Sequence, residues 1–174
     1  TFTSGTGADN GIHTFTNAVT LKTAGSQTVT VSGIAGPAVS PSSQTVTVNP
    51  AGAASFIVTA SDYLPTAGNA ISVTVTARDA FFNVATGYTG MVTFTSTDSS
   101  ATLPGNYTFT TGTGADNGTH TFSLVTLRTA GIQTVTATDT AAPFITGTTA
   151  NINVQPGAAA SFSVSAPASV PPYS

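Results

Sequence analysis

The chain contains no cysteine and no tryptophan, and only 5% of its 174 residues are charged, whereas ordinary soluble domains carry about 25%. The only basic residues are Lys22, Arg78 and Arg128. This excludes nucleic-acid binding, which needs clustered cations to displace counterions from the phosphates. Without disulfides a domain must rely on its apolar core, and about 100 residues can bury enough of one. No apolar run approaches the roughly 20 residues of a membrane helix, so we expect no membrane insertion in this segment.

An internal repeat organises what is present. Three stretches occur twice: residues 6–15 as 113–122, residues 21–30 as 127–136, and residues 50–56 as 156–162. The spacing is 107 residues between His13 and His120 but 106 between Leu21 and Leu127. A period of this size fits a whole domain, since solenoid and propeller units span about 20–50 residues. The sequence therefore predicts the C-terminal half of a domain in residues 1–49, a complete domain in 50–155, and the first strand of a following domain in 156–174.

Alternation of apolar and polar residues predicts the fold of the complete unit. Val73 and Val75 alternate with threonines, as do Val92 and Phe94, which is the pattern of half-buried strands. Strands are predicted near residues 54–61, 70–78, 88–96, 106–111, 118–127, 132–139 and 148–155. Seven short strands separated by Gly and Pro predict an all-β, immunoglobulin-like antiparallel sandwich. The side chains expected to point inward are Val73, Val75, Val92, Phe94, Phe109, Phe122 and Val135. The one-residue difference in spacing lies between residues 16–19 and 123–125, within a strand, so a β-bulge is expected next to Phe15 or Phe122.

The segment Ile71-Ser-Val-Thr-Val-Thr-Ala-Arg-Asp-Ala-Phe-Phe-Asn83, followed by Gly87 and by Val92-Thr-Phe94, resembles the bacterial immunoglobulin-like (Big) repeats of invasin- and intimin-type surface proteins. The Asp116-Asn-Gly118 turn is similar to that family's second half. The resemblance implies an extracellular, tandemly repeated, non-catalytic spacer, sometimes capped by an adhesive tip. Phe82 stands where the family usually has Gly, so we expect the loop to adopt a different turn.

Catalytic chemistry is not expected. Asp116, His120 and Ser123 have the residue types of a hydrolase triad, but they lie on one hairpin, whereas a triad converges from separate elements. We also expect His120 to face away from Phe122. The chain is therefore interpreted as not being an enzyme. The two histidines lack companion ligands for zinc, and no cofactor is expected.

Calcium is the one metal left open, because it accepts carboxylates and backbone carbonyls. Asp62, Asp79 and Asp139 could approach one another near a domain end, although Asp residues that cap turns are the simpler interpretation. Asn106 and Asn117 fit the N-glycosylation pattern, which arises readily by chance in a Thr-rich chain.

Two adjacent phenylalanines, Phe81 and Phe82, lie on a predicted loop. We expect both to pack under the loop as a plug for the core. The alternative is contact with a neighbouring domain, near Phe144 on another loop.

The function expected is structural: a stalk, or the wall of an extracellular fibre, in a large prokaryotic surface or secreted protein. Its partners would be neighbouring copies of the repeat, assembled head to tail and sharing strands. The half-unit would leave the apolar side chains of Phe2, Phe15, Val29 and Val46 exposed, and the missing strands would come from further sequence or from a neighbouring copy. The alternatives are an adhesin or carbohydrate-binding module, and an accessory domain of a secreted enzyme.

Overall fold

The computed structural model describes residues 2–34, 39–165 and 169 of the chain. These residues form β-strands and no helix, so the protein is all-β over its described part, as predicted. Accordingly, no helix long and apolar enough to cross a membrane occurs among them.

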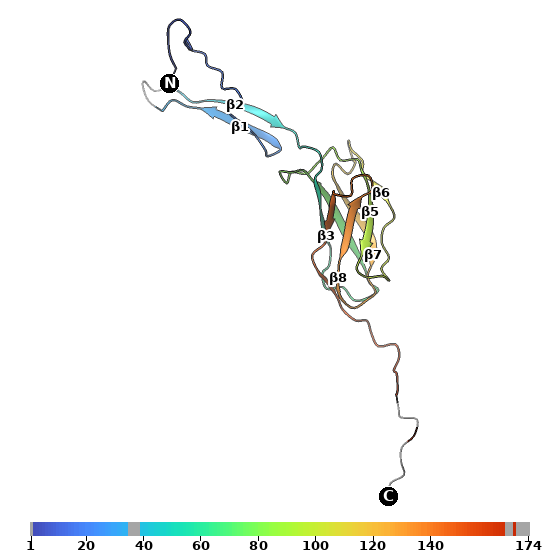
Figure 1. Ribbon diagram of the computed structural model, residues 1–174. Helices are drawn as coiled ribbons and strands as arrows, with labels where there is room; N and C mark the ends of the chain where they lie inside the picture. The colour runs from blue at the N-terminus through green and yellow to red at the C-terminus, as the bar shows by residue number, and fades with distance from the viewer. Residues whose placement is uncertain (1, 35–38, 166–168, 170–174) are drawn as a thin grey trace.

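Two antiparallel sheets make up the body of the molecule (Figure 1). The first has the order β3-β4-β7, and the second has the order β10-β9-β5-β6. Strands β8 and β11 form a separate pair. The strands are β3 (Ser55–Ala60), β4 (Ala70–Arg78), β5 (Met91–Ser96), β6 (Tyr107–Thr108), β7 (Thr119–Thr126), β8 (Gly131–Gln133), β9 (Val135–Asp139), β10 (Thr146–Thr148) and β11 (Ile152–Val154).

The core lies between the two sheets, and the prediction of its members is confirmed. All seven residues expected to point inward are buried. The ring of Phe94 on β5 packs edge-on against Phe122 on β7, with centroids 4.6 Å apart, so side chains of the two sheets meet face to face. On the outer face the hydroxyls of Thr74 and Thr121 are hydrogen-bonded at 2.8 Å. Antiparallel sheets packed in this way are compatible with a β-sandwich.

The bulge predicted in β7 is also confirmed. Ile71 pairs with Val125, but Val73 pairs with Phe122, so β7 carries one extra residue between these two pairs. Leu124 lies in the extra segment with φ of 63° and is 73% exposed. Asn17, its counterpart in the first copy of the repeat, has φ of 55°. The bulge keeps the buried face of β7 buried on both sides of the insertion.

The prediction of single strands at 132–139 and 148–155 is wrong. The first breaks at Thr134, because β8 pairs with β11 whereas β9 pairs with β5 and β10. The second breaks at Thr149, which exchanges hydrogen bonds with Val135 through its backbone N–H and its hydroxyl. Strand β5 begins later than expected, because Tyr88 turns inward and donates a hydrogen bond to Asp139 at 2.5 Å.

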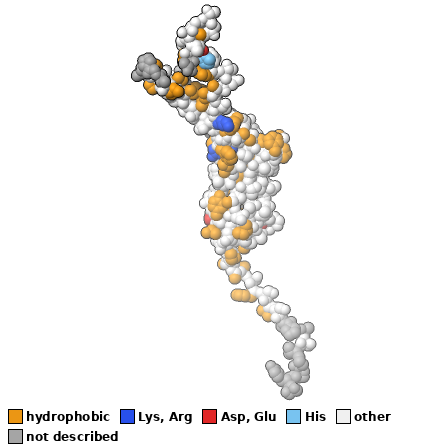
Figure 2. Space-filling model, turned by 60° about the vertical axis from the view of Figure 1, so that its left-hand side comes forward, with side chains coloured by type: hydrophobic (Ala, Val, Ile, Leu, Met, Phe, Trp, Pro, Cys, Tyr) orange, Lys and Arg blue, Asp and Glu red, His pale blue; other side chains and the backbone are white. Residues whose placement is uncertain are grey.

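The first copy of the repeat forms a two-stranded hairpin of β1 (Gly25–Val31) and β2 (Ser42–Val48), paired through all seven positions. Phe2, Phe15 and Val46 are exposed, as expected, and Val29 is half-buried. Figure 2 shows hydrophobic side chains gathered over this hairpin.

Every buried apolar side chain of the described residues lies between Phe56 and Val154. Beyond β11, residues 157–165 are extended without forming a strand, and Phe162 is 95% exposed, whereas its counterpart Phe56 is 5% exposed. The division into three domain segments therefore remains a prediction.

Candidate functional site

The Asp116–His120 pair holds a turn together. His120 Nδ1 lies 2.6 Å from an oxygen of Asp116, and the Tyr107 hydroxyl donates to the same carboxylate. Thr110 donates from both its backbone N–H and its hydroxyl. Burial raises the pKa of Asp116, but the hydrogen bonds from His120, Thr110 and Tyr107 outweigh that effect and lower the pKa below its usual value. Ser123 makes no hydrogen bond to either residue within the part of the chain that the structure describes, so no triad is assembled there.

The expectation that His120 faces away from Phe122 is wrong. The centroids of their rings lie 4.5 Å apart, and the centroid of the Tyr107 ring lies 4.0 Å from that of His120 and 5.3 Å from that of Phe122. Residues two apart on a strand share a face, so the imidazole belongs to an aromatic cluster rather than to an open surface.

The same turn recurs in the first copy of the repeat. Thr3 N–H donates to Asp9, as Thr110 N–H does to Asp116, with distances of 3.0 and 2.8 Å. His13 likewise contacts Asp9. Asn10 has the same φ of 47° as its counterpart in the second copy. This turn therefore forms from local hydrogen bonds, even where no sheet packs behind it.

The two glycosylation candidates occupy different environments. Asn106 is exposed next to β6. Asn117 lies in the turn with φ of 47°, and its amide accepts from Gly112 N–H while donating to Gly112 O and Ala115 O. A glycan on Asn117 would have to break one of those two donated bonds, because the attached amide retains a single hydrogen.

The calcium candidates are not brought together. Asp62 follows the end of β3, and Asp79 follows the end of β4; these ends are opposite because Ser55 pairs with Arg78 in the antiparallel ladder. Among residues 2–34 and 39–165, no three His, Cys, Asp or Glu side chains lie close enough together to hold a metal ion. Asp139 instead binds Tyr88 and the backbone N–H groups of the loop after β9, which is the turn-capping arrangement.

A second buried carboxylate, Asp98, was not singled out by the sequence. Its two oxygens accept hydrogen bonds from the N–H groups of Ser100, Arg128 and Thr129 and from the Thr129 hydroxyl. Burial raises the pKa of Asp98, but these hydrogen bonds, with Thr129 foremost, lower it to about 2. Asp98 thus fixes the turn between β7 and β8 to the loop after β5.

Asp79 organises the loop that joins β4 to β5. Its carboxylate accepts hydrogen bonds from the N–H groups of Phe81 and Asn83, from the Asn83 side-chain amide, and from Ala51 N–H in the segment before β3. Burial raises the pKa of Asp79, but these bonds, led by the Asn83 amide, lower it to about 2. One buried carboxylate therefore fixes both the loop and the incoming chain.

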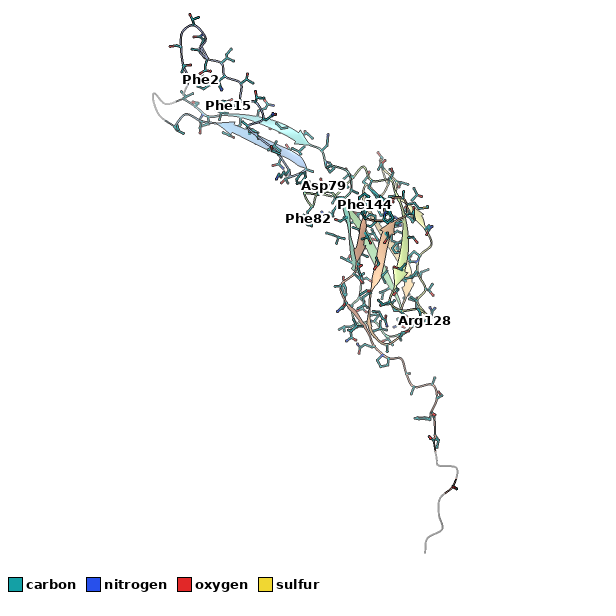
Figure 3. All side chains as sticks on the ribbon, viewed as in Figure 1. Phe2, Phe15, Asp79, Phe82, Arg128 and Phe144 are labelled. Carbon is teal, nitrogen blue, oxygen red and sulfur yellow. The ribbon has the colours of Figure 1, made fainter. Side chains whose placement is uncertain are left out.

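The expected core plug is wrong, because Phe81 is 49% exposed and Phe82 is 74% exposed. Phe144 is exposed as well (Figure 3). Phe82 has a φ of 63°, in the left-handed region that glycine favours. Hydrogen bonds from Phe82 N–H to Asp79 O and from the Arg78 guanidinium to Phe82 O hold this strained residue.

The same loop binds the first copy of the repeat. The Asn83 side-chain amide donates to Lys22 O at 2.7 Å and accepts from Ala24 N–H at 2.9 Å. The Lys22 ammonium lies 5.5 Å from the centroid of the Phe81 ring, a cation–π distance. Because Asn83 is itself held by Asp79, the amide is positioned before it meets the backbone of residues 22–24. We call Asp79–Asn83 the clamp loop.

Comparison with known proteins gives no assignment. No protein-family model matches the sequence, and no curated protein matches it significantly.

One open groove adjoins the clamp loop. It has a volume of about 380 Å³ and is lined by residues 50–53 and 87–90. Its lining consists of Pro, Ala, Gly, Thr and Tyr88, whose hydroxyl is already committed to Asp139. At this end of the molecule the Asn83 amide binds backbone groups, and the Phe81 ring faces the Lys22 ammonium. Sequence reasoning gave Asn83 no binding role, because its partners Lys22 O and Ala24 N–H are backbone groups.

Proposed function

We propose that this chain is a structural segment of an extracellular stalk or fibre, built from immunoglobulin-like domains in tandem, in a large prokaryotic surface protein. The observation that carries the proposal is the contact between the clamp loop and residues 22–24. Asn83 bonds two backbone groups of the first copy of the repeat, and Asp79 holds the connecting segment at Ala51 N–H. Three hydrogen bonds at a short joint restrain how one unit is oriented on the next.

The surface chemistry supports a structural role. In each copy of the repeat, Thr and Ser hydroxyls on neighbouring strands form hydrogen bonds with one another. The pairs are Thr30–Ser43 in the first copy and Thr136–Thr148 and Thr138–Thr146 in the second. Such pairs stabilise a sheet without any charge. Uncharged hydroxyls keep a surface of this kind hydrated, which suits a module that acts as a spacer.

The β1–β2 hairpin supports assembly from several copies. Two strands alone are marginally stable in water. Within the described part of the chain no further strand pairs with either edge of this hairpin, and Phe2 and Phe15 are exposed beside it. In the proposed stalk or fibre, strands of an adjoining unit cover these edges head to tail.

The test is surface labelling of the source cells. An antibody raised against the chain should label intact cells, and electron microscopy should find the label on thin projections away from the cell body. Permeabilised cells and an antibody to a cytoplasmic protein serve as controls. Labelling that requires permeabilisation would overturn the proposal.

A further inference from the structure

The turn after β7 repeats the turn that the clamp loop holds. Leu127-Arg-Thr-Ala-Gly131 is the counterpart of Leu21-Lys-Thr-Ala-Gly25. Gly131 and Gly25 have φ of 111° and 108°, and they pair with Val154 and Val48, which are themselves counterparts. The two turns therefore present the same backbone groups, next to the point where the chain leaves the hairpin or the sheet.

One turn is occupied and the other is open. Lys22 O and Ala24 N–H are bonded by Asn83, and Ala24 is half-buried. Among the residues that the structure describes, Arg128 O and Ala130 N–H have no hydrogen-bond partner, and Ala130 is exposed. Arg128 lies at the end of the body opposite to Asp79 and Phe82 (Figure 3).

We infer that Arg128 O and Ala130 N–H form the docking site for the clamp loop of a second copy of this repeat. The occupant offers an amide at the position of Asn83, held by a carboxylate at the position of Asp79. The inference rests on the proposed function, because it needs a further unit after Gln155. That unit would follow β11 as the segment that begins β3 follows β2.

The open turn is already shaped for this partner. Asp98 accepts the N–H groups of Arg128 and Thr129, which leaves the Arg128 carbonyl and the Ala130 N–H as the free pair. We expect no counterpart of the Lys22–Phe81 contact at this turn, since the Arg128 guanidinium is hydrogen-bonded to Ser100 O and Thr102 Oγ1. Recognition at this end therefore relies on the two backbone groups.

Amide hydrogen exchange tests the inference. The 174-residue chain is compared with a longer chain in which a second copy of residues 50–155, which contains a complete buried core, follows Gln155. Ala24 should be protected in both chains, and Ala130 should exchange about tenfold more slowly in the longer one, the effect of one added hydrogen bond. Asn83→Ala in the second copy should abolish protection of Ala130 alone, and Asn83→Ala in the first copy should abolish protection of Ala24 alone.

Protected core amides in the added copy establish that it has folded. Unprotected Ala130 beside a folded second copy would overturn the inference and leave surface labelling of the cells unaffected. Protection of Ala130 that survives Asn83→Ala in the second copy would overturn it as well, because the occupant would then be another group.

Discussion

Replacing Asp98 by Asn should destabilise the protein by about 2–3 kcal/mol. The carboxylate is buried and accepts three backbone N–H groups and one hydroxyl, at 2.6–3.0 Å. Each carboxylate oxygen accepts two of these hydrogen bonds, and Asn turns one oxygen into a donor. Two donors then lose their partner: either the N–H groups of Arg128 and Thr129, or the N–H of Ser100 and the hydroxyl of Thr129. Each unsatisfied buried donor costs about 1–3 kcal/mol. Ser100, Arg128 and Thr129 are themselves exposed, so water relieves part of that cost and the lower end of the range applies, about 1–1.5 kcal/mol for each donor.

Urea unfolding at pH 7, followed by circular dichroism, measures this effect. The matched control is Asp62→Asn, because Asp62 is exposed and accepts a single N–H, that of Leu64. Surface changes of this kind cost at most about 0.5 kcal/mol. If both variants lose the same stability, the assignment of Asp98 as the link between the two loops is refuted.

Asp98→Asn should also make the free energy of unfolding depend less on pH in the acid range. In the folded protein the pKa of Asp98 is lowered to about 2 from its ordinary value of 3.8. The folded state then binds fewer protons than the unfolded state, so this stabilisation is complete above about pH 4 and is lost as the pH falls through 2. Asp98→Asn should lose less stability than the native chain between pH 4 and pH 2. The loss does not vanish, because Asp79 also has a pKa of about 2.

Three further substitutions test the packing, each by the change in free energy of unfolding. Leu124→Asn should stabilise by about 0.5–1 kcal/mol, because Leu124 has a φ of 63° and Asn tolerates the left-handed region better; an unchanged stability would show that the bulge is unstrained. Gly147→Ala should cost more than about 2 kcal/mol, since a Cβ there would lie 2.2 Å from Phe56 O on β3 of the other sheet, and a neutral result would contradict this close approach. Phe94→Ala should cost about 3–5 kcal/mol, and a loss below 1 kcal/mol would contradict its place between the sheets.

The sequence predicted the core well, because period-two alternation depends only on which face of a strand is buried. Val73, Val75 and Phe94 could be placed inward without knowing which strands pair. The bulge near Leu124 followed from the one-residue difference between copies. The alternation could not reveal that the chain changes partners at Thr134, since a strand shows the same pattern whichever neighbour it joins.

The candidate site was less accessible to sequence reasoning. Asn83 binds backbone groups of residues 22–24, and backbone groups carry no sequence signature. The exposure of Phe82 was missed because packing beneath the loop is the usual fate of such a ring, whereas here Asp79 fixes the loop in a conformation that turns the ring outward. Asp98 escaped notice because its partners, Arg128 and Thr129, are 30 residues away and donate mainly through their backbone.

The central claim is that the clamp loop holds adjoining units in one orientation. The chain has no cysteine, so spin labels can be attached at Thr28→Cys on β1 and Thr95→Cys on β5, both exposed. Pulsed electron paramagnetic resonance of the labelled 174-residue chain should give a single narrow distance distribution, which broadens when Asn83→Ala is added. A broad distribution in the chain that retains Asn83 would contradict the claim.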